Sequence, residues 1–350
     1  MRILIVTDAW FPQVNGVVRT LDTVSRTLRA QGHAVETITP GDFRTIPCPT
    51  YPEIRLALRP GPAIARRIDS FAPEAIHIAT EGPLGLAARR LCLRRGLPFT
   101  TSFHTKFPEY LHARFRIPVS WGYRWMRYFH SRAERVMVAT DTIMAELKGW
   151  GFDNTVRWSR GVDTELFRPR AADAVPEAVR SLARPIHLYV GRVAVEKNIE
   201  AFLERDLAGT KLVVGDGPQM AELRRRFPDA VFAGARHGED LARYFAAADV
   251  FVFPSRTDTF GLVLLEALAS GTPVAAFPVP GPLDVIADPA VGCLDMDLAA
   301  AARQALTLDR AACRAYALGH SWQACAAQFE AHLVSVAPAP AVSPERFAAA

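Results

Sequence analysis

The sequence has few cysteines, and none of them stands in a spacing typical of a disulfide framework or a zinc site. There are five in 350 residues, scattered and without a CxxC or Cys/His pattern. No apolar run approaches the ~18 to 20 residues that a membrane span needs. The stretch MRILIVTDAW places Asp8 where the apolar part of a signal peptide would continue. We therefore expect the cysteines to be packing residues and the protein to be cytoplasmic.

Three common site fingerprints are also missing. No GxGxxG follows the first apolar stretch, and neither a GxxxxGK[ST] loop nor a GxSxG elbow occurs. These absences argue against a Rossmann dinucleotide site, a P-loop and an α/β-hydrolase nucleophile. If the protein binds phosphate, it has to hold that group in another way.

The length and the charge distribution indicate two unlike halves. A chain of 350 residues exceeds the size at which one core usually keeps growing, so two domains are expected. Residues 1–168 hold 24 Lys and Arg against 15 Asp and Glu, whereas residues 169–350 hold 17 against 21. Arginine supplies nearly all of the excess in the first half. A basic face of this kind suits nucleic acid, an anionic membrane surface or an acidic ligand.

Short apolar or β-branched stretches alternate with helical patterns in both halves. This alternation predicts an α/β fold with two doubly wound parallel sheets. The expected strands lie in RILIVTD, AVETITP, EAIHIAT, PFTTSFHT and RVMVAT, then in IHLYVGR, TKLVVGDGP, AVFAGARH, VFVFPS and TPVAAFP. We place the first domain at 1–168, the second at 169–320, a helix at about 321–336 and a Pro/Ala-rich tail at 337–350. Ligands of such sheets bind beyond the carboxyl ends of the strands.

The loop after IHLYV carries two cations, Arg192 and Lys197, on either side of a tight turn. Two fixed cations at the end of a strand can bracket a diphosphate. Gly191, just before them, permits close approach of the backbone to a ligand. The alternative interpretation is a pair of solvated surface charges.

Three further signals are weaker when taken alone. Asn15 and Gly16 open the first long helical pattern, where a helix N-terminus can meet an anion. Gly215 lies in a Gly-rich turn that is equally consistent with plain chain reversal. His104 ends an expected strand, either as a structural histidine or as a contact to a substrate hydroxyl or donor sugar.

The stretch PSRTDTFGLVLLEALASG carries two acids. Asp258 precedes an apolar helix, and Glu266 lies inside it between LVLL and ALA. A buried carboxylate needs hydrogen-bond partners, and the paired hydroxyl groups of a ribose would provide them. The alternative is an ordinary helix residue at 266 and a dipole-stabilised acid at 258. The backbone around the start of this helix is expected to face phosphate: Phe260, Gly261, Leu262 and Val263.

Together these motifs resemble the retaining nucleotide-sugar glycosyltransferases of family 4, over nearly the whole chain. The most specific element is the family's pattern of an acid, seven residues and Glu, in which Asp258 replaces the usual first Glu. By this resemblance Glu266 holds the ribose and Asp258 approaches the donor sugar. Arg192 and Lys197 match the family's pair that binds the diphosphate.

The resemblance implies the GT-B fold, in which an acceptor-binding and a donor-binding Rossmann-like domain face each other across a cleft. The helix at about 321–336 would then cross back onto the first domain. Asn15 and Gly16 match a Gly-rich loop of the family, and His104 matches an acceptor-side histidine. Arg236 is expected beside the base, although nothing there separates uracil from guanine.

Departure of a nucleoside diphosphate needs charge stabilisation, which Arg192, Lys197 and helix N-termini can supply. We therefore expect a nucleotide sugar, UDP- or GDP-linked, as co-substrate and no metal cofactor. Retention in the family is explained by same-face attack, with the leaving phosphate taking the proton of the acceptor.

The aromatic and basic composition of residues 110–135 bears on the kind of acceptor. They form either a core helix with a solvated face or a basic aromatic surface that lies on anionic lipid. The aromatic and basic residues concerned are Trp121, Tyr123, Trp125, Tyr128, Phe129, Arg114, Arg116, Arg124, Arg127 and Arg132. We favour the lipid surface over nucleic acid. Within the family, the motifs look most like those of lipid glycosyltransferases and GDP-mannose-dependent mannosyltransferases.

The main hypothesis is therefore transfer of a hexosyl group to a lipid such as diacylglycerol or phosphatidylinositol, at the inner face of the cytoplasmic membrane. One alternative is a GDP-mannose-dependent alpha-mannosyltransferase that uses a soluble or polysaccharide acceptor. Two others belong to different classes: a non-hydrolysing nucleotide-sugar epimerase and a non-catalytic nucleotide-sugar binding protein. Nucleotide release that requires an acceptor would exclude the epimerase.

Overall fold

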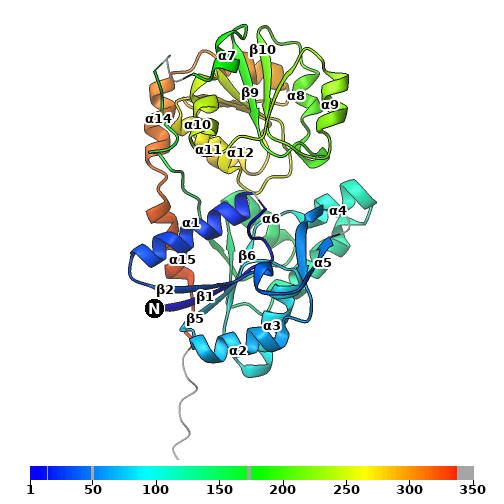
Figure 1. Ribbon diagram of the computed structural model, residues 1–350, viewed down its shortest axis with the longest axis vertical. Helices are drawn as coiled ribbons and strands as arrows, with labels where there is room; N and C mark the ends of the chain where they lie inside the picture. Colours follow the sequence, from blue (N-terminus) through cyan, green and yellow to red (C-terminus); the bar gives the residue numbers. More distant parts are fainter. Residues whose placement is uncertain (14, 49–50, 172–174, 337–350) are drawn as a thin grey trace, which may run out of the picture.

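The computed structural model describes residues 1–13, 15–48, 51–171 and 175–336, which form two α/β domains (Figure 1). Each domain is built on a six-stranded parallel sheet, in the order β2-β1-β5-β6-β7-β8 in the first and β11-β10-β9-β12-β13-β14 in the second. The first sheet consists of β1 (Arg2–Val6), β2 (Ala34–Ile38), β5 (Ala75–Ile78), β6 (Thr100–Phe103), β7 (Arg135–Val138) and β8 (Thr155–Arg157). The second consists of β9 (Ile186–Val190), β10 (Thr210–Val214), β11 (Val231–Gly234), β12 (Val250–Phe253), β13 (Val274–Ala276) and β14 (Gly292–Leu294).

Helices cover both faces of each sheet, which explains why the strands are apolar along most of their length. On the first sheet, one face packs against α1 (Gly16–Ala30) and α15 (Trp322–His332). The other face packs against α2 (Gly61–Phe71), α3 (Pro83–Arg95), α5 (Val119–His130) and α6 (Asp141–Gly149). On the second sheet, one face packs against α10 (Gly238–Ala247), α11 (Leu262–Ala269) and α14 (Arg310–Leu318), and the other against α8 (Glu200–Leu203), α9 (Met220–Arg226) and α13 (Leu298–Ala305).

Helix α15 follows the second domain in the chain but packs on the first, beside α1 (Figure 1). The indole N–H of Trp158 donates to the carbonyl of Cys325 at 3.1 Å. The backbone N–H of Val336 donates to the carbonyl of Glu74 at 2.7 Å. The chain thus crosses between the domains twice, and this double crossing ties them together.

Several elements are absent from the sequence-based expectation. They are the hairpin β3 (Thr45–Cys48) and β4 (Tyr51–Ala57), strands β8 and β14, and helices α2, α4 (Phe107–Phe115), α6, α7 (Glu177–Arg180) and α12 (Pro282–Val285). Most are short, and β3 and β4 contain prolines, which weaken strand patterns. The predicted tail at 337–350 lies outside the described residues.

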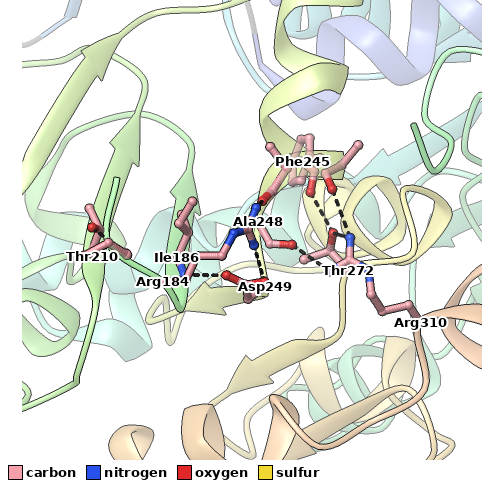
Figure 2. A network of polar contacts seen from close by, with 11 residues as sticks. Arg184, Ile186, Thr210, Phe245, Ala248, Asp249, Thr272 and Arg310 are labelled. Carbon is pink, nitrogen blue, oxygen red and sulfur yellow. Dashed lines mark hydrogen bonds and ion pairs between the residues drawn. The ribbon is translucent and has the colours of Figure 1, made fainter. Parts of the chain in front are cut away.

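A polar network closes the amino end of the second sheet (Figure 2). Asp249 accepts the N–H of Ile186, the first residue of β9, at 2.7 Å and is paired with Arg184. Arg310 donates to the carbonyl of Ala248 at 2.7 Å. A cavity of about 420 Å³ beside the network is lined by both arginines. Because both guanidinium groups already bind the protein itself, we interpret this end of the sheet as structural.

Candidate active site

The loops that follow the carboxyl ends of the strands meet between the two domains. The hydroxyl group of Thr259, in the loop after β12, donates to the backbone carbonyl of His104, just after β6, at 2.7 Å. Tyr110, on α4 of the first domain, lies in the electrostatic field of Lys197 and Asp258 of the second. Burial raises the pKa of Tyr110 to about 12. Predicted site residues of the two domains therefore lie close together, and we call the region between these loops the cleft.

Lys197 and Asp258 are partners of each other. Nζ of Lys197 lies 2.5 Å from Oδ1 of Asp258, and the two side chains are only 20% and 18% exposed. Lys197 ends a short 3-10 turn (Val195–Lys197), and Asn198 follows in the left-handed conformation. The amide of Asn198 donates to the carbonyl of Pro254 at 3.0 Å, which fixes this turn against the Asp258 loop.

The ammonium group of Lys197 is held in its charged form. Burial lowers its pKa, but the Asp258 carboxylate and the hydroxyl groups of Tyr110 and Tyr189 outweigh burial, so the pKa lies above its usual value. Oδ2 of Asp258 is buried and accepts no hydrogen bond within the described chain. Lys197, which we expect at the diphosphate, thus binds one oxygen of Asp258, which we expect at the sugar. The other oxygen of Asp258 has no partner among the described residues.

Glycines allow the strand ends of the second domain to approach each other closely. Gly215, after β10, has a φ of 147°, and a Cβ atom there would stand 1.8 Å from the carbonyl oxygen of Gly191, after β9. The N–H of Gly215 donates to the carbonyl of Gly234 at 2.9 Å. Three adjacent strands therefore end in a backbone surface without side chains, next to the Lys197 turn.

Glu266 is almost completely buried and is bound from the other domain. Its side chain is 3% exposed, and Oε1 lies 2.5 Å from Nη2 of Arg19 on α1. Oε2 is buried and accepts no hydrogen bond within the described residues. The expected burial of this acid is therefore observed. Its partner in the free protein is an arginine that the sequence did not single out.

The start of α11 faces the start of α1. Gly261, with a φ of 83°, turns the chain into α11, and Leu262 and Val263 form its first turn. A Cβ atom on Gly16 would lie 3.6 Å from Cδ1 of Leu262. Phe260, by contrast, is 8% exposed and packs in the core of the second domain.

Asn15 acts as the N-cap of α1. Its side-chain oxygen accepts the N–H groups of Val17 and Val18, each at 3.0 Å. Two of the backbone N–H groups at the start of α1, which were expected to bind an anion, therefore already donate to Asn15. An anion at this helix end has to compete with Asn15.

The two remaining predicted cations are placed differently. The carbonyl of Arg192 accepts the hydroxyl of Tyr189 at 2.9 Å, which fixes the backbone at the start of the Lys197 loop. Arg236 donates to the carbonyl of Ala233 at 2.8 Å and lies 3.4 Å from Asp240. Among the described residues, these contacts of Arg236 stay within its own loop and helix.

His104 lies at the end of β6, partly buried and with its ring against Trp158. Its Nδ1 is 3.4 Å from a guanidinium nitrogen of Arg160, and its Nε2 is buried without a partner in the described chain. Burial, followed by the charge of Arg160, places the pKa of His104 well below its usual value.

No group of three or more His, Cys, Asp and Glu side chains among the described residues could hold a metal ion. The chain contains one Asp-x-Asp sequence, Asp295 to Asp297. Asp297 caps α13 by accepting the N–H of Ala299 at 3.0 Å, and Asp295 accepts the N–H of Asp297 at 2.8 Å. These two acids therefore serve the turn into α13.

Sequence reasoning missed four residues of the site: Arg19, Tyr110, Arg160 and Thr259. Arg19 lies one helical turn after Asn15 and Tyr110 lies six residues after His104, so both stand near residues that were singled out. Their contacts nevertheless cross between distant segments, as in the Arg19–Glu266 pair. Local patterns do not encode such pairs.

On the surface of the first domain, α5 carries an exposed aromatic face, and α4, which packs against α5, carries the exposed rings of Phe107 and Phe115. Trp121, Trp125 and Tyr128 are 63%, 45% and 55% exposed and border a hollow of about 540 Å³ with Arg124. Helix α5 also buries Tyr123, so the core-helix interpretation holds for its opposite face. Within the part of the chain that the structure describes, no helix is both long enough and apolar enough to cross a membrane.

Residues 14–166 match the family model Glycosyltransferase Family 4, and residues 184–309 match Glycosyl transferases group 1. A GDP-mannose-dependent alpha-mannosyltransferase of Mycobacterium tuberculosis is 32% identical, over 84% of this chain and 83% of that protein. An alpha-monoglucosyldiacylglycerol synthase of Streptococcus pneumoniae is 29% identical, over 87% and 78%. The solved sucrose-phosphate synthase of Thermosynechococcus elongatus superimposes with a TM-score of 0.74 at 23% identity, over 94% of this chain and 97% of that one.

These similarities extend over both domains and agree with two facing parallel sheets of the GT-B type. The chain belongs to glycosyltransferase family 4 and is a glycosyltransferase with the GT-B fold.

Proposed function

We propose that this glycosyltransferase moves a hexosyl group, with retention, from a UDP- or GDP-linked sugar to a hydroxyl group of a membrane lipid. The acceptor is of the diacylglycerol or phosphatidylinositol type, and the protein works as a peripheral protein on the inner face of the cytoplasmic membrane. The observation that carries this proposal is the exposed aromatic face of α5, which packs against α4, the helix whose Tyr110 lies near Lys197 and Asp258.

Helix α4 connects the cleft to this face. Tyr110 on α4 lies near Lys197 and Asp258. Phe107 and Phe115 on the same helix are 43% and 51% exposed. A lipid whose chains rest against the exposed aromatic face can therefore present its head group at the cleft, within the length of one short helix.

The charge around the face suits an anionic bilayer. Four arginines of the segment are exposed: Arg116, Arg124, Arg127 and Arg132. Each basic residue near an anionic membrane contributes about 1 kcal/mol of attraction, and partly inserted aromatic rings add a salt-independent contribution. A face with both features binds peripherally and needs no spanning helix.

On the donor side, we assign the diphosphate to Arg192 and Lys197, the ribose to Glu266 and the sugar to Asp258 and His104. The open oxygens of Asp258 and Glu266 and the raised pKa of Lys197 support this assignment. Lys197 exchanges part of its contact with Asp258 for the diphosphate and stabilises the leaving group without a metal ion.

The names of the relatives support the proposal and define a second candidate. The Streptococcus pneumoniae relative is named for a diacylglycerol lipid. The Mycobacterium tuberculosis relative is named as a GDP-mannose-dependent alpha-mannosyltransferase, which makes GDP-mannose a candidate donor. The alternative is therefore mannosyl transfer from GDP-mannose to a soluble or polysaccharide acceptor.

Co-sedimentation with vesicles tests the lipid proposal. We expect the protein to pellet with vesicles that contain anionic lipid, and the bound fraction to fall as salt rises. The double variant Trp121→Ser/Trp125→Ser should lose at least about tenfold in vesicle affinity, because two rings no longer insert. Leu318→Ser is the matched control, since Leu318 is 55% exposed on the other domain.

Activity assays on the same proteins complete the test. UDP-glucose, UDP-galactose and GDP-mannose are offered with diacylglycerol or phosphatidylinositol in vesicles, or with soluble mannosides. Failure to bind anionic vesicles at low salt, together with transfer to a soluble sugar, would overturn the lipid proposal in favour of the alternative.

A further inference from the structure

Arg160 is a buried cation next to the cleft. The residue is 5% exposed, and burial lowers its pKa to about 10. Its Nη1 donates to the carbonyls of Trp158 at 2.6 Å and Ser159 at 3.1 Å. Its Cζ lies 4.1 Å from the centre of the Trp158 ring. These contacts fix the orientation of the guanidinium group.

Among the described residues, no carboxylate forms an ion pair with Arg160. A buried charge without a counter-ion is costly, so its retention calls for an explanation other than stability. Apart from the carbonyls and the Trp158 ring, its contact is with His104, whose Nδ1 lies 3.4 Å from Nη2 of Arg160.

This contact determines which nitrogen of His104 carries the proton. A guanidinium group has only donors and cannot accept a hydrogen bond. Nδ1 of His104 must therefore be the acceptor, and the ring proton resides on Nε2. That nitrogen is buried and has no partner in the described chain. A buried N–H donor without an acceptor indicates that a ligand oxygen completes it.

The surroundings of His104 hold the imidazole ring in place and keep it neutral. Its carbonyl accepts the hydroxyl of Thr259, beside Asp258, and its ring packs against Trp158. The titratable groups whose charges act on it are Arg160, His77 and His130, and all three oppose protonation. No acid is among these groups, and Glu81 pairs with Nε2 of His130 at 3.1 Å.

We propose that Arg160 is a positioning residue that fixes His104 as the Nε2–H tautomer, so that His104 donates a hydrogen bond to an oxygen of a bound substrate. His104 then orients substrate in this state and does not act as a general base. Only the identity of that oxygen, on the donor sugar or on the acceptor, rests on the proposed function.

Nuclear magnetic resonance of the whole protein tests the tautomer without substrate. Long-range proton–nitrogen spectra of protein labelled with imidazole-¹⁵N histidine distinguish the two tautomers and the cation. The chain has nine histidines, and the His104 signals are assigned from their loss in His104→Asn. We expect the Nε2–H form of His104 from pH 5 to pH 8.5. An Nδ1–H ring, or a ring that titrates in this range, would overturn the proposal.

A variant series tests the role of Arg160 itself. In Arg160→Met the donor and the charge are lost, so His104 should populate both tautomers, and its pKa should rise from the native value although burial still holds it below the ordinary one. Transfer activity at pH 8 should then fall about twofold, because a ring in the Nδ1–H form has no proton on Nε2 to donate, and the loss should shrink at lower pH, where the cation carries that proton. Arg157→Met is the matched control, since Arg157 is a partly exposed arginine of β8 paired with Asp141.

The outcomes are distinguishable. An unchanged His104 tautomer and an unchanged pH profile in a folded Arg160→Met protein would show that Arg160 is only structural. If this variant does not fold, the native spectrum alone decides the matter. A correct tautomer in a protein that transfers no sugar would refute the proposed function and leave this inference standing.

Discussion

At the scale of single residues, the described structure pairs most of the charged groups that the sequence singled out. Lys197 is bound to Asp258 and Glu266 to Arg19, while Oδ2 of Asp258 and Oε2 of Glu266 stay open. Each acid thus has one oxygen bound by the protein and one buried oxygen without a partner among the described residues. This half-satisfied state is typical of binding sites, since full internal pairing would leave nothing for the substrate.

The first prediction at this scale concerns Glu266→Gln. If Glu266 binds the ribose, this change replaces a charged hydrogen bond by a neutral one and should weaken nucleotide binding about 10- to 100-fold. Isothermal titration with UDP and GDP measures the effect. Glu204→Gln, at a 48% exposed acid of the same domain, should bind like the native protein. Equal affinity in both variants would refute the ribose role.

At the scale of elements, the two ends of the second sheet have different tasks. The carboxyl end carries the glycines and the Lys197 turn, whereas the network of Asp249, Arg184 and Arg310 closes the amino end. In doubly wound sheets, ligands bind at the carboxyl ends, so the amino end is free to serve stability. The cavity next to Arg184 and Arg310 therefore needs no ligand to explain it.

Asp249→Ala separates these two tasks. The change leaves the N–H of Ile186 and the guanidinium group of Arg184 without their carboxylate, and should cost about 1–3 kcal/mol of unfolding free energy. Urea unfolding measures the cost, and Asp229→Ala, at an exposed acid of the same domain, is the control. Nucleotide affinity should not change; a large loss of affinity would contradict a purely structural network.

At the scale of the whole molecule, the cleft is held by contacts between domains. Arg19 binds Glu266, Thr259 binds the carbonyl of His104, and Asp284 of the second domain accepts the N–H of Thr142 at 3.0 Å. The ion pair with Arg19 uses Glu266, the carboxylate that we propose binds the ribose. Nucleotide binding and the arrangement of the domains are therefore expected to be coupled.

Arg19→Met tests this coupling. The change leaves Glu266 buried without its cation, so the free protein should melt a few degrees lower. A ribose would restore partners to Glu266, so the rise in Tm with nucleotide should exceed the native rise, which corresponds to about 2.7 kcal/mol at 100 times Kd. Thermal shift with UDP and GDP measures both. A smaller rise than in the native protein would mean that Arg19 itself contacts the nucleotide.

The sequence by itself determined the two parallel sheets, most of their strands and the family. It could do so because strand burial, glycine turns and the spacing of Asp258 and Glu266 are local patterns. The domain limits and the roles of the individual site residues stay predictions. Local patterns also missed β8 and the hairpin, which are short and depend on their neighbours.

Only the tertiary structure decided which charges meet. It brought Arg19 to Glu266, Asp258 to Lys197 and Arg160 to His104, and it left Arg236 within its own loop. Each of these three pairs joins segments more than 50 residues apart. Their distances follow from how the two sheets and α15 pack, and packing is a property of the whole chain that no local pattern carries.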